Sequence, residues 1–361
     1  MEYNRRDVEV ELKIQRLLSE MPVPDFIWEE FYIDQRINDR GILVDTGFAE
    51  KAVELDNNVK KELFPKLKEL TGLDNPNSPA QMKDWLMRQG IEADSLDKKS
   101  MPGLLATAPD DVKEVLMLYQ QLSKSSVSKY HTMLGASCED GRARGMFSFY
   151  GANRTGRFAG RLIQLQNLPQ NHLDDLAEIK GLIMSGDLDS VKERFEDIPD
   201  VLSQLIRTAF IPPEDKKFIV ADFSAIEARV ISWLAGETWR MEAFANGEDI
   251  YCACAAKMFG VPVEKNGVNG HLRQKGKIAE LACGYGGSIG AIKAMGGTEL
   301  NLTDDELYSL VEDWRKTSPN IVKLWSDVQS VAVKVITDQS SMTFGKLRFS
   351  YEIGILFIEL P

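Results

Sequence analysis

The stretch Phe218-Ile-Val-Ala-Asp-Phe-Ser-Ala-Ile-Glu-Ala-Arg229 decides how the rest of this 361-residue chain is interpreted. Its first residues form a short apolar run that ends at Asp222, a pattern that predicts a buried strand. Residues 224–234 are predicted to form a helix. A carboxylate at the C-terminal end of a strand is a common ligand of Mg²⁺. By position alone, however, capping of the following helix is the simpler interpretation of Asp222.

A second informative stretch runs from His271 to Tyr285 and is also predicted to be helical. One face of that helix carries, in order, Arg273, Lys277, Glu280 or Leu281, and Gly284 or Tyr285. Two cations one turn apart can bind a triphosphate, and an apolar residue with a tyrosine can pack against a flat base. An ordinary amphipathic helix with its cations in solvent is the alternative. The mixed character of this face makes that alternative weaker.

Basic residues are segregated in an acidic chain, whose 43 Lys and Arg against 55 Asp and Glu give a net charge of −12. Two segments hold cations and no acid. Residues 141–173 contain Arg142, Arg144, Arg154, Arg157 and Arg161, and residues 265–279 contain Lys265, Arg273, Lys275 and Lys277. Such segments can face phosphate or can be chance clusters on a solvated face, and charge alone does not decide. In the first segment, Gln166 and Asn167 can read minor-groove base edges, although Gln-Asn before proline is more often a turn.

Composition excludes several classes of protein. The length allows two or three domains, and 43% hydrophobic with 27% charged residues is typical of a folded globular chain. The charged residues 1–7 do not form a signal peptide, and no apolar run approaches the roughly 18 residues that span a bilayer. The four cysteines make no disulfide or zinc framework. We therefore expect reduced, mostly buried thiols in a cytoplasmic protein without membrane association.

Helical patterns dominate the rest of the chain, which predicts an α+β fold that is mainly helical. We expect helices over residues 7–19, 47–70, 79–89, 110–134, 237–245, 249–259, 271–285 and 304–337, and strands within residues 142–171 and 343–360. Ser78 and Gln81 are expected to form a capping box at the helix over residues 79–89. The acidic residues 174–200 are expected to be a helical insertion on the surface.

Three of these motifs occur in an order that matches one family. Thr155-Gly-Arg157 with Leu165-Gln-Asn-Leu-Pro169 comes first, Asp222-Phe-Ser-Ala-Ile-Glu-Ala-Arg229 second, and Arg273…Lys277…Tyr285-Gly286 third. In this combination the chain resembles family A DNA polymerases, the DNA polymerase I group, and most closely their phage and prophage members. The second and third motifs look like motifs A and B of that family. The resemblance runs from Phe26 to the end and implies a fragment of the right-hand polymerase fold.

The resemblance also implies a role for each matched residue. Asp222 and Lys277 would be catalytic, and Asp222 with the backbone carbonyl of Phe223 would bind paired Mg²⁺ ions. Glu227 would be the steric gate that excludes a 2′-hydroxyl. The deoxynucleoside triphosphate would be bound by Phe223, Glu227, Arg273, Lys277, Leu281 and Tyr285. Primer–template DNA would be contacted by Lys124, Lys129, Arg154, Arg157, Gln166, Asn167 and Gly286.

The same resemblance implies five parts. Residues 1–20 would be the end of a 3′–5′ exonuclease domain, because Tyr3 and Asp7 match its last motif. Residues 21–140 would form a thumb-like helical region, 141–236 the first part of a palm with the insertion 174–200, and 237–338 the fingers. Residues 339–361 would begin an incomplete return to the palm.

Three departures from the family pattern stand out. Leu281 stands where many members have Phe or Tyr, which puts sugar discrimination in doubt, and Tyr251 stands where His is frequent. The family's motif C, a His-Asp-Glu with the second metal-binding carboxylate, has no match. None of the three histidines, His131, His172 and His271, is followed by Asp-Glu.

The sequence thus predicts half of a DNA polymerase that acts in template-directed DNA synthesis. One carboxylate is a poor two-ion site, so we expect the chain alone not to extend a primer efficiently. A second polypeptide could supply the rest of the palm. The alternative is a non-catalytic DNA- or nucleotide-binding remnant of a prophage polymerase. A single-subunit RNA polymerase is a weaker alternative, because Glu227 at the gate position favours deoxynucleotides.

Overall fold

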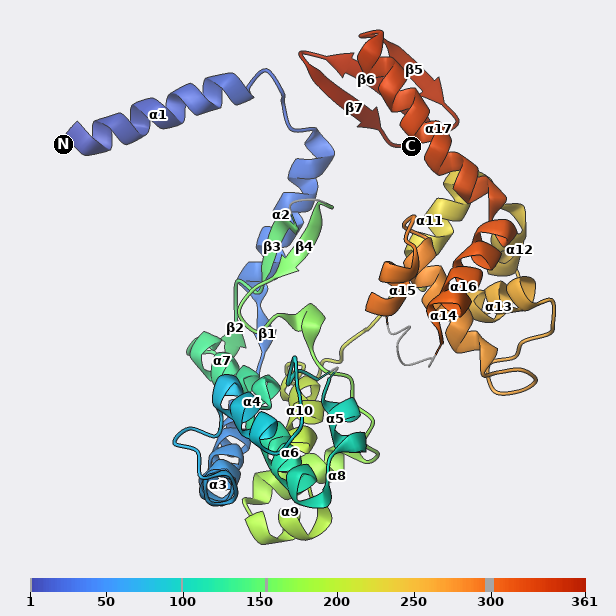
Figure 1. The fold of residues 1–361 in the computed structure, drawn as a ribbon. Helices are drawn as coiled ribbons and strands as arrows, with labels where there is room; N and C mark the ends of the chain where they lie inside the picture. The colour runs from blue at the N-terminus through green and yellow to red at the C-terminus, as the bar shows by residue number, and fades with distance from the viewer. Residues whose placement is uncertain (1, 99, 153–154, 296–301) are drawn as a thin grey trace. The chain divides into compact units, whose positions relative to one another are not determined.

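The computed structural model describes residues 2–98, 100–152, 155–295 and 302–361. The chain divides into two compact units, Met1–Ile219 and Val220–Pro361. Helices make up most of both units (Figure 1). The division falls inside residues 141–236, the stretch expected to be one part of a palm.

The first unit combines helices with two small antiparallel sheets. Its helices are α1 (Glu2–Leu18), α2 (Asp25–Arg40), α3 (Thr46–Thr71), α4 (Pro79–Arg88), α5 (Met101–Thr107), α6 (Asp110–Leu122), α7 (Ser128–Ala136), α8 (Leu176–Ser185), α9 (Leu188–Arg194) and α10 (Ile198–Leu205), with 3₁₀ turns η1 (Ser125–Val127), η2 (Leu165–Asn167) and η3 (Ile206–Ala209). Strand β1 (Ile42–Leu43) pairs with β2 (Arg142–Ala143), and β3 (Phe147–Ala152) pairs with β4 (Arg157–Gly160).

Helix α3 organises the first unit because its two ends lie in two different cores. Asp45 caps its N-terminus by accepting the N–H of Phe48 at 3.0 Å. Phe48 is fully buried in a core with residues of α7, α8 and α10. Leu67, five turns further along, is fully buried in a second core with residues of α4, α5 and α6. A single long helix therefore links both halves of the unit.

Residues 174–200 are part of the first core, so the expectation of a solvated insertion is wrong. Ile179, Ile183, Val191 and Ile198 are 1–3% exposed and pack in the same core as Phe48. The acidic side chains lie on the outer faces of the same short helices. The high charge of the segment masks the spacing of its apolar residues, which is what places it inside.

Two predicted helices are divided, and one predicted cap differs. Residues 110–134 form α6 and α7 with η1 between them. Residues 304–337 form two helices that meet at Ser318, because Pro319 begins the second. Ser78 does accept the N–H of Gln81, but the Gln81 side chain accepts from the backbone N–H of Asn75. The N-terminus of α4 is therefore capped without the predicted capping box.

The second unit contains seven described helices and one antiparallel meander. The helices are α11 (Ile226–Ala235), α12 (Thr238–Ala245), α13 (Ile250–Phe259), α14 (Leu272–Cys283), α15 (Ile289–Ala294), α16 (Asp304–Thr317) and α17 (Pro319–Thr337). The meander is β5 (Ser341–Phe344), β6 (Leu347–Glu352) and β7 (Ile355–Glu359), which confirms the strands predicted within residues 343–360. Residues of α13, α14 and α16 form the main core, and α17 packs on the meander.

Residues 218–222 do not form the predicted strand. Phe218, Ile219 and Val220 are 49%, 87% and 91% exposed, and the sheets of the described residues do not include them. A strand needs a neighbour for its backbone N–H and C=O groups, which an apolar run alone cannot supply. Asp222 therefore lies on an exposed loop before α11. It does not cap α11 either, since the N-cap residue is Ala225 and makes no side-chain hydrogen bond.

The cysteines agree with the expectation of reduced, mostly buried thiols. All four cysteines are free thiols; Cys252, Cys254 and Cys283 are buried and Cys138 is exposed. Among the residues that the structure describes, we find no helix with the length and apolar character needed to cross a membrane.

Replacement of Ile183 by Ala should lower the free energy of unfolding of the first unit by about 2–5 kcal/mol, because it removes buried apolar volume from the core. Urea unfolding measures this value. The matched control is Met184→Ala, since Met184 is 41% exposed on the same helix, and it should change the value by about 0.5 kcal/mol or less. Equal losses in the two variants would contradict a core position for α8.

Candidate functional site

An apolar cleft of about 460 Å³ lies between α11 and α14, wholly within the second unit. Residues of α11 line one side, and the C-terminal part of α14 lines the other. Four of the predicted nucleotide-binding residues meet there: Phe223, Glu227, Leu281 and Tyr285. Tyr251, which stands at the position where the family often has His, also lines the cleft. The cleft is mostly apolar, so a flat ring system suits its surface.

A polar contact joins the two sides of the cleft. The hydroxyl of Tyr285 donates a hydrogen bond to the carboxylate of Glu227. Glu227 lies in the first turn of α11, and Tyr285 follows the last turn of α14. The next residue, Gly286, has φ +75° and nothing within 4 Å of where a Cβ would lie. The chain can turn there because glycine tolerates this backbone conformation.

Helix α14 lies unusually close to α13. A Cβ at Gly276 would lie 2.4 Å from the carbonyl oxygen of Tyr251 and 2.9 Å from the Cβ of Ala255. Only glycine therefore allows this approach. The contact sets the distance between the helix that carries Arg273 and Lys277 and the helix that carries Tyr251.

Arg273 is paired with Asp249, the residue that caps α13. Its Nη2 and Nε lie 2.7 Å and 2.9 Å from Oδ2 of Asp249. The other carboxylate oxygen accepts the N–H groups of Tyr251 and Cys252 at 2.9 Å and 3.2 Å. Burial opposes ionisation of Asp249, but hydrogen bonds from Arg273 and the Cys252 N–H, with the Arg273 charge, outweigh it and lower its pKa.

The Asp249 pair holds Arg273 beside the cleft. The guanidinium carbon lies 5.3 Å from the ring centre of Tyr251, a residue of the cleft wall. Lys277, one turn further along α14, is partly exposed. The structure thus keeps both predicted triphosphate-binding cations on α14, with Arg273 already oriented by an acidic partner.

Asp222 and Phe223 do not by themselves fit a two-ion site. Both are exposed, and the Phe223 carbonyl accepts the N–H of Ile226 at 3.2 Å. Carboxylate and carbonyl oxygens are ligands that Mg²⁺ prefers. However, the residues described by the structure include no group of three or more His, Cys, Asp or Glu side chains that could hold a metal ion. These two residues offer suitable atoms for one ion but too few of them.

The predicted DNA-contact residues lie mainly in the first unit. Arg157 begins β4, and Gln166 and Asn167 belong to η2; all three are exposed. The Gln166 side chain lies against β4, since a Cβ at Gly160 would be 2.4 Å from its Oε1. Arg154 lies outside the described residues. The structure therefore brings Arg157, Gln166 and Asn167 to neighbouring elements.

Two predicted phosphate-binding lysines already have protein partners. Lys124 forms an ion pair with Asp200, and Lys129 donates to the carbonyl of Ile163 at 2.7 Å. Burial lowers the pKa of Lys129. Neither amine is presented to solvent in the way the sequence predicts, so each would have to exchange a partner to meet a phosphate.

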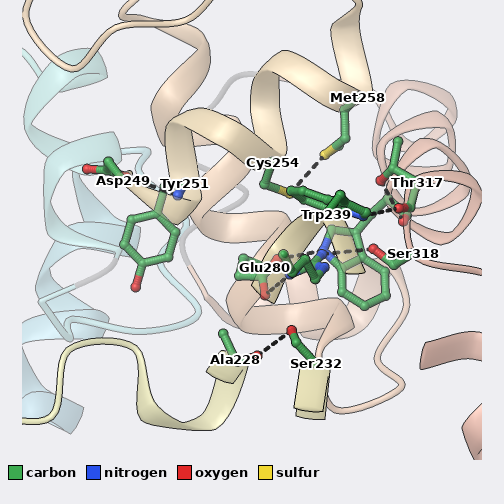
Figure 2. A network of polar contacts seen from close by, with 12 residues as sticks. Ala228, Ser232, Trp239, Asp249, Tyr251, Cys254, Met258, Glu280, Thr317 and Ser318 are labelled. Atoms are coloured by element: carbon green, nitrogen blue, oxygen red, sulfur yellow. Dashed lines mark hydrogen bonds and ion pairs between the residues drawn. The ribbon is translucent and has the colours of Figure 1, made fainter. Parts of the chain in front are cut away.

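Sequence reasoning missed Asp249 and the buried pair Arg240–Glu280, whose atoms Nη1 and Oε1 lie 2.5 Å apart. The sequence does contain a signal for Asp249 as a helix cap, because Asp directly before a helical pattern is a typical N-cap. Arg240 and Glu280 are 40 positions apart, and no local pattern pairs residues at that separation. Figure 2 labels Glu280, one member of this pair, together with the neighbouring Trp239 and Ser318.

Comparisons with known proteins identify the family of the chain. The sequence pattern of DNA polymerase family A matches residues 48–353. A DNA polymerase of Bacillus phage SP02 is 46% identical over an alignment of 361 positions that covers 99% of this chain and 56% of that protein. A thermostable DNA polymerase I of Thermus thermophilus is 32% identical over 143 residues, 39% of this chain and 16% of that protein. The chain thus spans only part of the length of these relatives.

A solved structure shows the same fold. The POL domain of Pol1 from M. smegmatis, in complex with DNA primer-template and dNTP, matches 84% of this chain and 48% of its own chain. The TM-score is 0.60 and the sequence identity 20%. The expected fold class, a mainly helical α+β fragment of the right-hand polymerase fold, is confirmed. This chain belongs to DNA polymerase family A.

Replacement of Gly276 by Ala should lower the free energy of unfolding of the second unit by about 1–3 kcal/mol, because the new methyl group would push α14 away from α13. Thermal or urea unfolding measures the loss. The control is Gly290→Ala in α15, where no atom lies within 4 Å of the new Cβ. That variant should be more stable by about 0.5–1 kcal/mol. A gain in stability at both positions would refute the close contact.

The Asp249–Arg273 pair should make stability depend on pH in a defined direction. Because the folded-state pKa of Asp249 is lowered, its stabilisation is complete above the ordinary aspartate pKa of about 4 and is lost as the pH falls through the folded-state value. Asp249→Asn should therefore be less stable than the wild type at pH 7 and equally stable at strongly acidic pH. Urea unfolding across this range measures the difference, and a constant difference at every pH would contradict the pair.

Proposed function

We propose that this chain takes part in template-directed DNA synthesis and binds a deoxynucleoside triphosphate in the cleft between α11 and α14. The observation that carries the proposal is the meeting of Glu227, Leu281 and Tyr285 in one apolar cleft. The same helix, α14, carries Arg273 and Lys277 one turn apart. The membership of the chain in DNA polymerase family A supports the nucleotide as the ligand.

Each part of the nucleotide has a matching surface. Arg273 and Lys277 hold the triphosphate, because charge-assisted hydrogen bonds to phosphate oxygens are strong and directional. Leu281 and Tyr285 contact the base by apolar packing and stacking. Glu227 is the steric gate for the sugar. The hydrogen bond from Tyr285 helps to orient its carboxylate, and a 2′-hydroxyl at this place would meet that carboxylate.

Primer–template DNA is the second proposed ligand. Arg157, Gln166 and Asn167 contact the duplex in the minor groove, and Gly286 lets the chain approach DNA closely. The M. smegmatis structure holds primer-template DNA and dNTP, which supports the same pair of ligands here. Lys124 and Lys129 contribute less, because both amines are engaged within the protein. On this proposal residues 21–140 act as thumb, 141–236 as the first part of the palm and 237–338 as fingers, in the cytoplasm.

Asp222 is proposed as one of two carboxylates that bind paired Mg²⁺ ions. Lys277 is proposed as a further catalytic residue. Mg²⁺ supplies charge neutralisation and an activated hydroxyl in this class of reaction. The described residues around Asp222 do not complete such a site, and no His-Asp-Glu occurs in the sequence. We therefore infer that the 361 residues alone bind nucleotide but extend a primer poorly. The other carboxylate would come from residues outside these 361, and a second polypeptide that carries them is a proposed partner.

The alternative function is non-catalytic binding of nucleotide or DNA. The lack of a described metal-binding cluster around Asp222 favours it. Primer extension by the 361-residue protein together with a polypeptide that contains the missing His-Asp-Glu motif distinguishes the two. Mg²⁺-dependent extension by the mixture supports a split polymerase, and nucleotide binding without extension supports the alternative. Robust extension by the 361 residues alone would contradict the inferred inactivity.

Replacement of Arg273 by Ala should weaken binding of dATP in the presence of Mg²⁺ by about 10- to 100-fold, as expected for a lost hydrogen bond to a charged group. Isothermal titration calorimetry measures the affinity, and circular dichroism confirms that the variant is folded. The control is Lys323→Ala, which removes a 70% exposed cation from α17. It should leave the affinity unchanged. Equal affinities of the wild type and Arg273→Ala for dATP would contradict the proposed role of Arg273.

A further inference from the structure

The second unit contains a buried ion pair that the proposed nucleotide site does not use. Arg240 on α12 is 0% exposed and Glu280 on α14 is 4% exposed. Glu280 also accepts a hydrogen bond from the indole N–H of Trp314 at 2.9 Å. Arg240 donates to the hydroxyl of Ser318 at 2.8 Å. The pair therefore connects α12, α14, α16 and the start of α17.

Among the described residues, Glu280 is the charged partner of Arg240. The guanidinium lies 4.7 Å from the ring centre of Trp239 and 5.0 Å from that of Trp314. Its Nε is buried, and within the described residues it has no hydrogen-bond partner. Removal of one member of such a pair leaves an uncompensated buried charge, which is strongly destabilising. Replacement of both members by apolar residues is often neutral for stability.

Glu280 stands next to the residues that form the cleft. It directly precedes Leu281, lies five residues before Tyr285, and itself contributes to the cleft lining. Gly276, one turn earlier on α14, fixes the distance to α13 through its close contact with Tyr251. Two contacts one turn apart, to different neighbours, fix the rotation of a helix about its axis. A rotation by one residue is 100°, enough to turn Leu281 out of the cleft.

We propose that Glu280, held by Arg240 and Trp314, is a positioning residue for nucleotide binding. It fixes the rotation of α14, so that Leu281 and Tyr285 face the cleft while Arg273 and Lys277 face the triphosphate. The inference rests on the proposed function of the cleft.

The test separates positioning from stability by comparing single and double variants of the 361-residue protein. Glu280→Gln leaves the Arg240 charge uncompensated and should lower both the melting temperature and the affinity for dATP with Mg²⁺. The double variant Arg240→Met with Glu280→Leu removes both charges and should recover most of the melting temperature. Its dATP affinity should remain at least about tenfold below that of the wild type, because nothing directional then orients α14. A purely structural role predicts that affinity and melting temperature recover together.

A matched control removes an ion pair that does not touch α14. Lys323→Met with Asp327→Leu deletes a pair of similar length on α17 and should leave the dATP affinity unchanged. A milder variant, Trp314→Phe, deletes one hydrogen bond to Glu280 and should lower the affinity by a smaller factor than the double variant. Wild-type affinity in a folded Arg240→Met, Glu280→Leu protein would overturn the positioning role.

Hydrogen exchange provides a readout that does not depend on nucleotide binding. The backbone amides of α14 should exchange faster in the double variant than in the wild type, whereas those of β5, β6 and β7 should be unchanged. If the wild type fails to bind dATP, the proposed function fails, and the exchange of α14 alone then decides the positioning inference. Unchanged protection of α14 in the double variant would overturn it.

Discussion

The close approach of α14 to α13 at Gly276 is the constraint on which the candidate site depends. Because no side chain separates the two helices there, the Tyr251 end of α13 lies within reach of Arg273 and the cleft. The distance between these helices determines whether Arg273 can contact both Asp249 and the Tyr251 ring. Replacement of one hydrogen atom by a methyl group would change this geometry, so the sequence has little freedom at this position.

The charged residues of α14 differ in burial and in the partner that each of them has. Glu280 is buried and neutralised by Arg240, and it acts within the protein. Arg273 is partly exposed and has an acidic partner that still leaves it at the edge of the cleft. A cation that is already oriented loses less conformational freedom on binding an anion, but the anion must compete with the carboxylate. On the proposed function, Asp249 would both orient Arg273 for a phosphate and limit the affinity that Arg273 can provide.

Most of the helices and the grouping of cleft residues could be predicted from the sequence. The spacing of Arg273, Lys277 and Leu281 fixes their positions around α14, since helical periodicity is a local property, and Tyr285 follows just after the helix ends. Residues 218–222 could not be predicted in the same way, because strand formation depends on a neighbour that the local pattern does not contain. The prediction of a solvated insertion at residues 174–200 was wrong for a related reason. The charged side chains of this segment lie on its outer surface, whereas Ile179 and Ile183 determine where it packs.

The network around Arg240 could not be predicted from the sequence. Its members come from residues 239–240, 280 and 314–318, which tertiary structure alone brings together. Lys124 illustrates the reverse case. Its charge predicts an exposed phosphate contact, but the fold places Asp200 beside it. Local patterns predict where a charge sits along the chain and leave open which charge of the opposite sign will meet it.

The exposed run at residues 218–222 also affects how the protein behaves in concentrated solution. Phe218, Ile219 and Val220 combine high β-propensity with unpaired backbone groups, which is the composition of segments that associate edge to edge. Lys216 and Lys217 precede the run and Asp222 follows it. Flanking charges of this kind can act as gatekeepers, because two such segments aligned in parallel bring Lys next to Lys and Asp next to Asp. Asp222, which is proposed to bind Mg²⁺, is therefore also one of the charges that disfavour parallel association of this run.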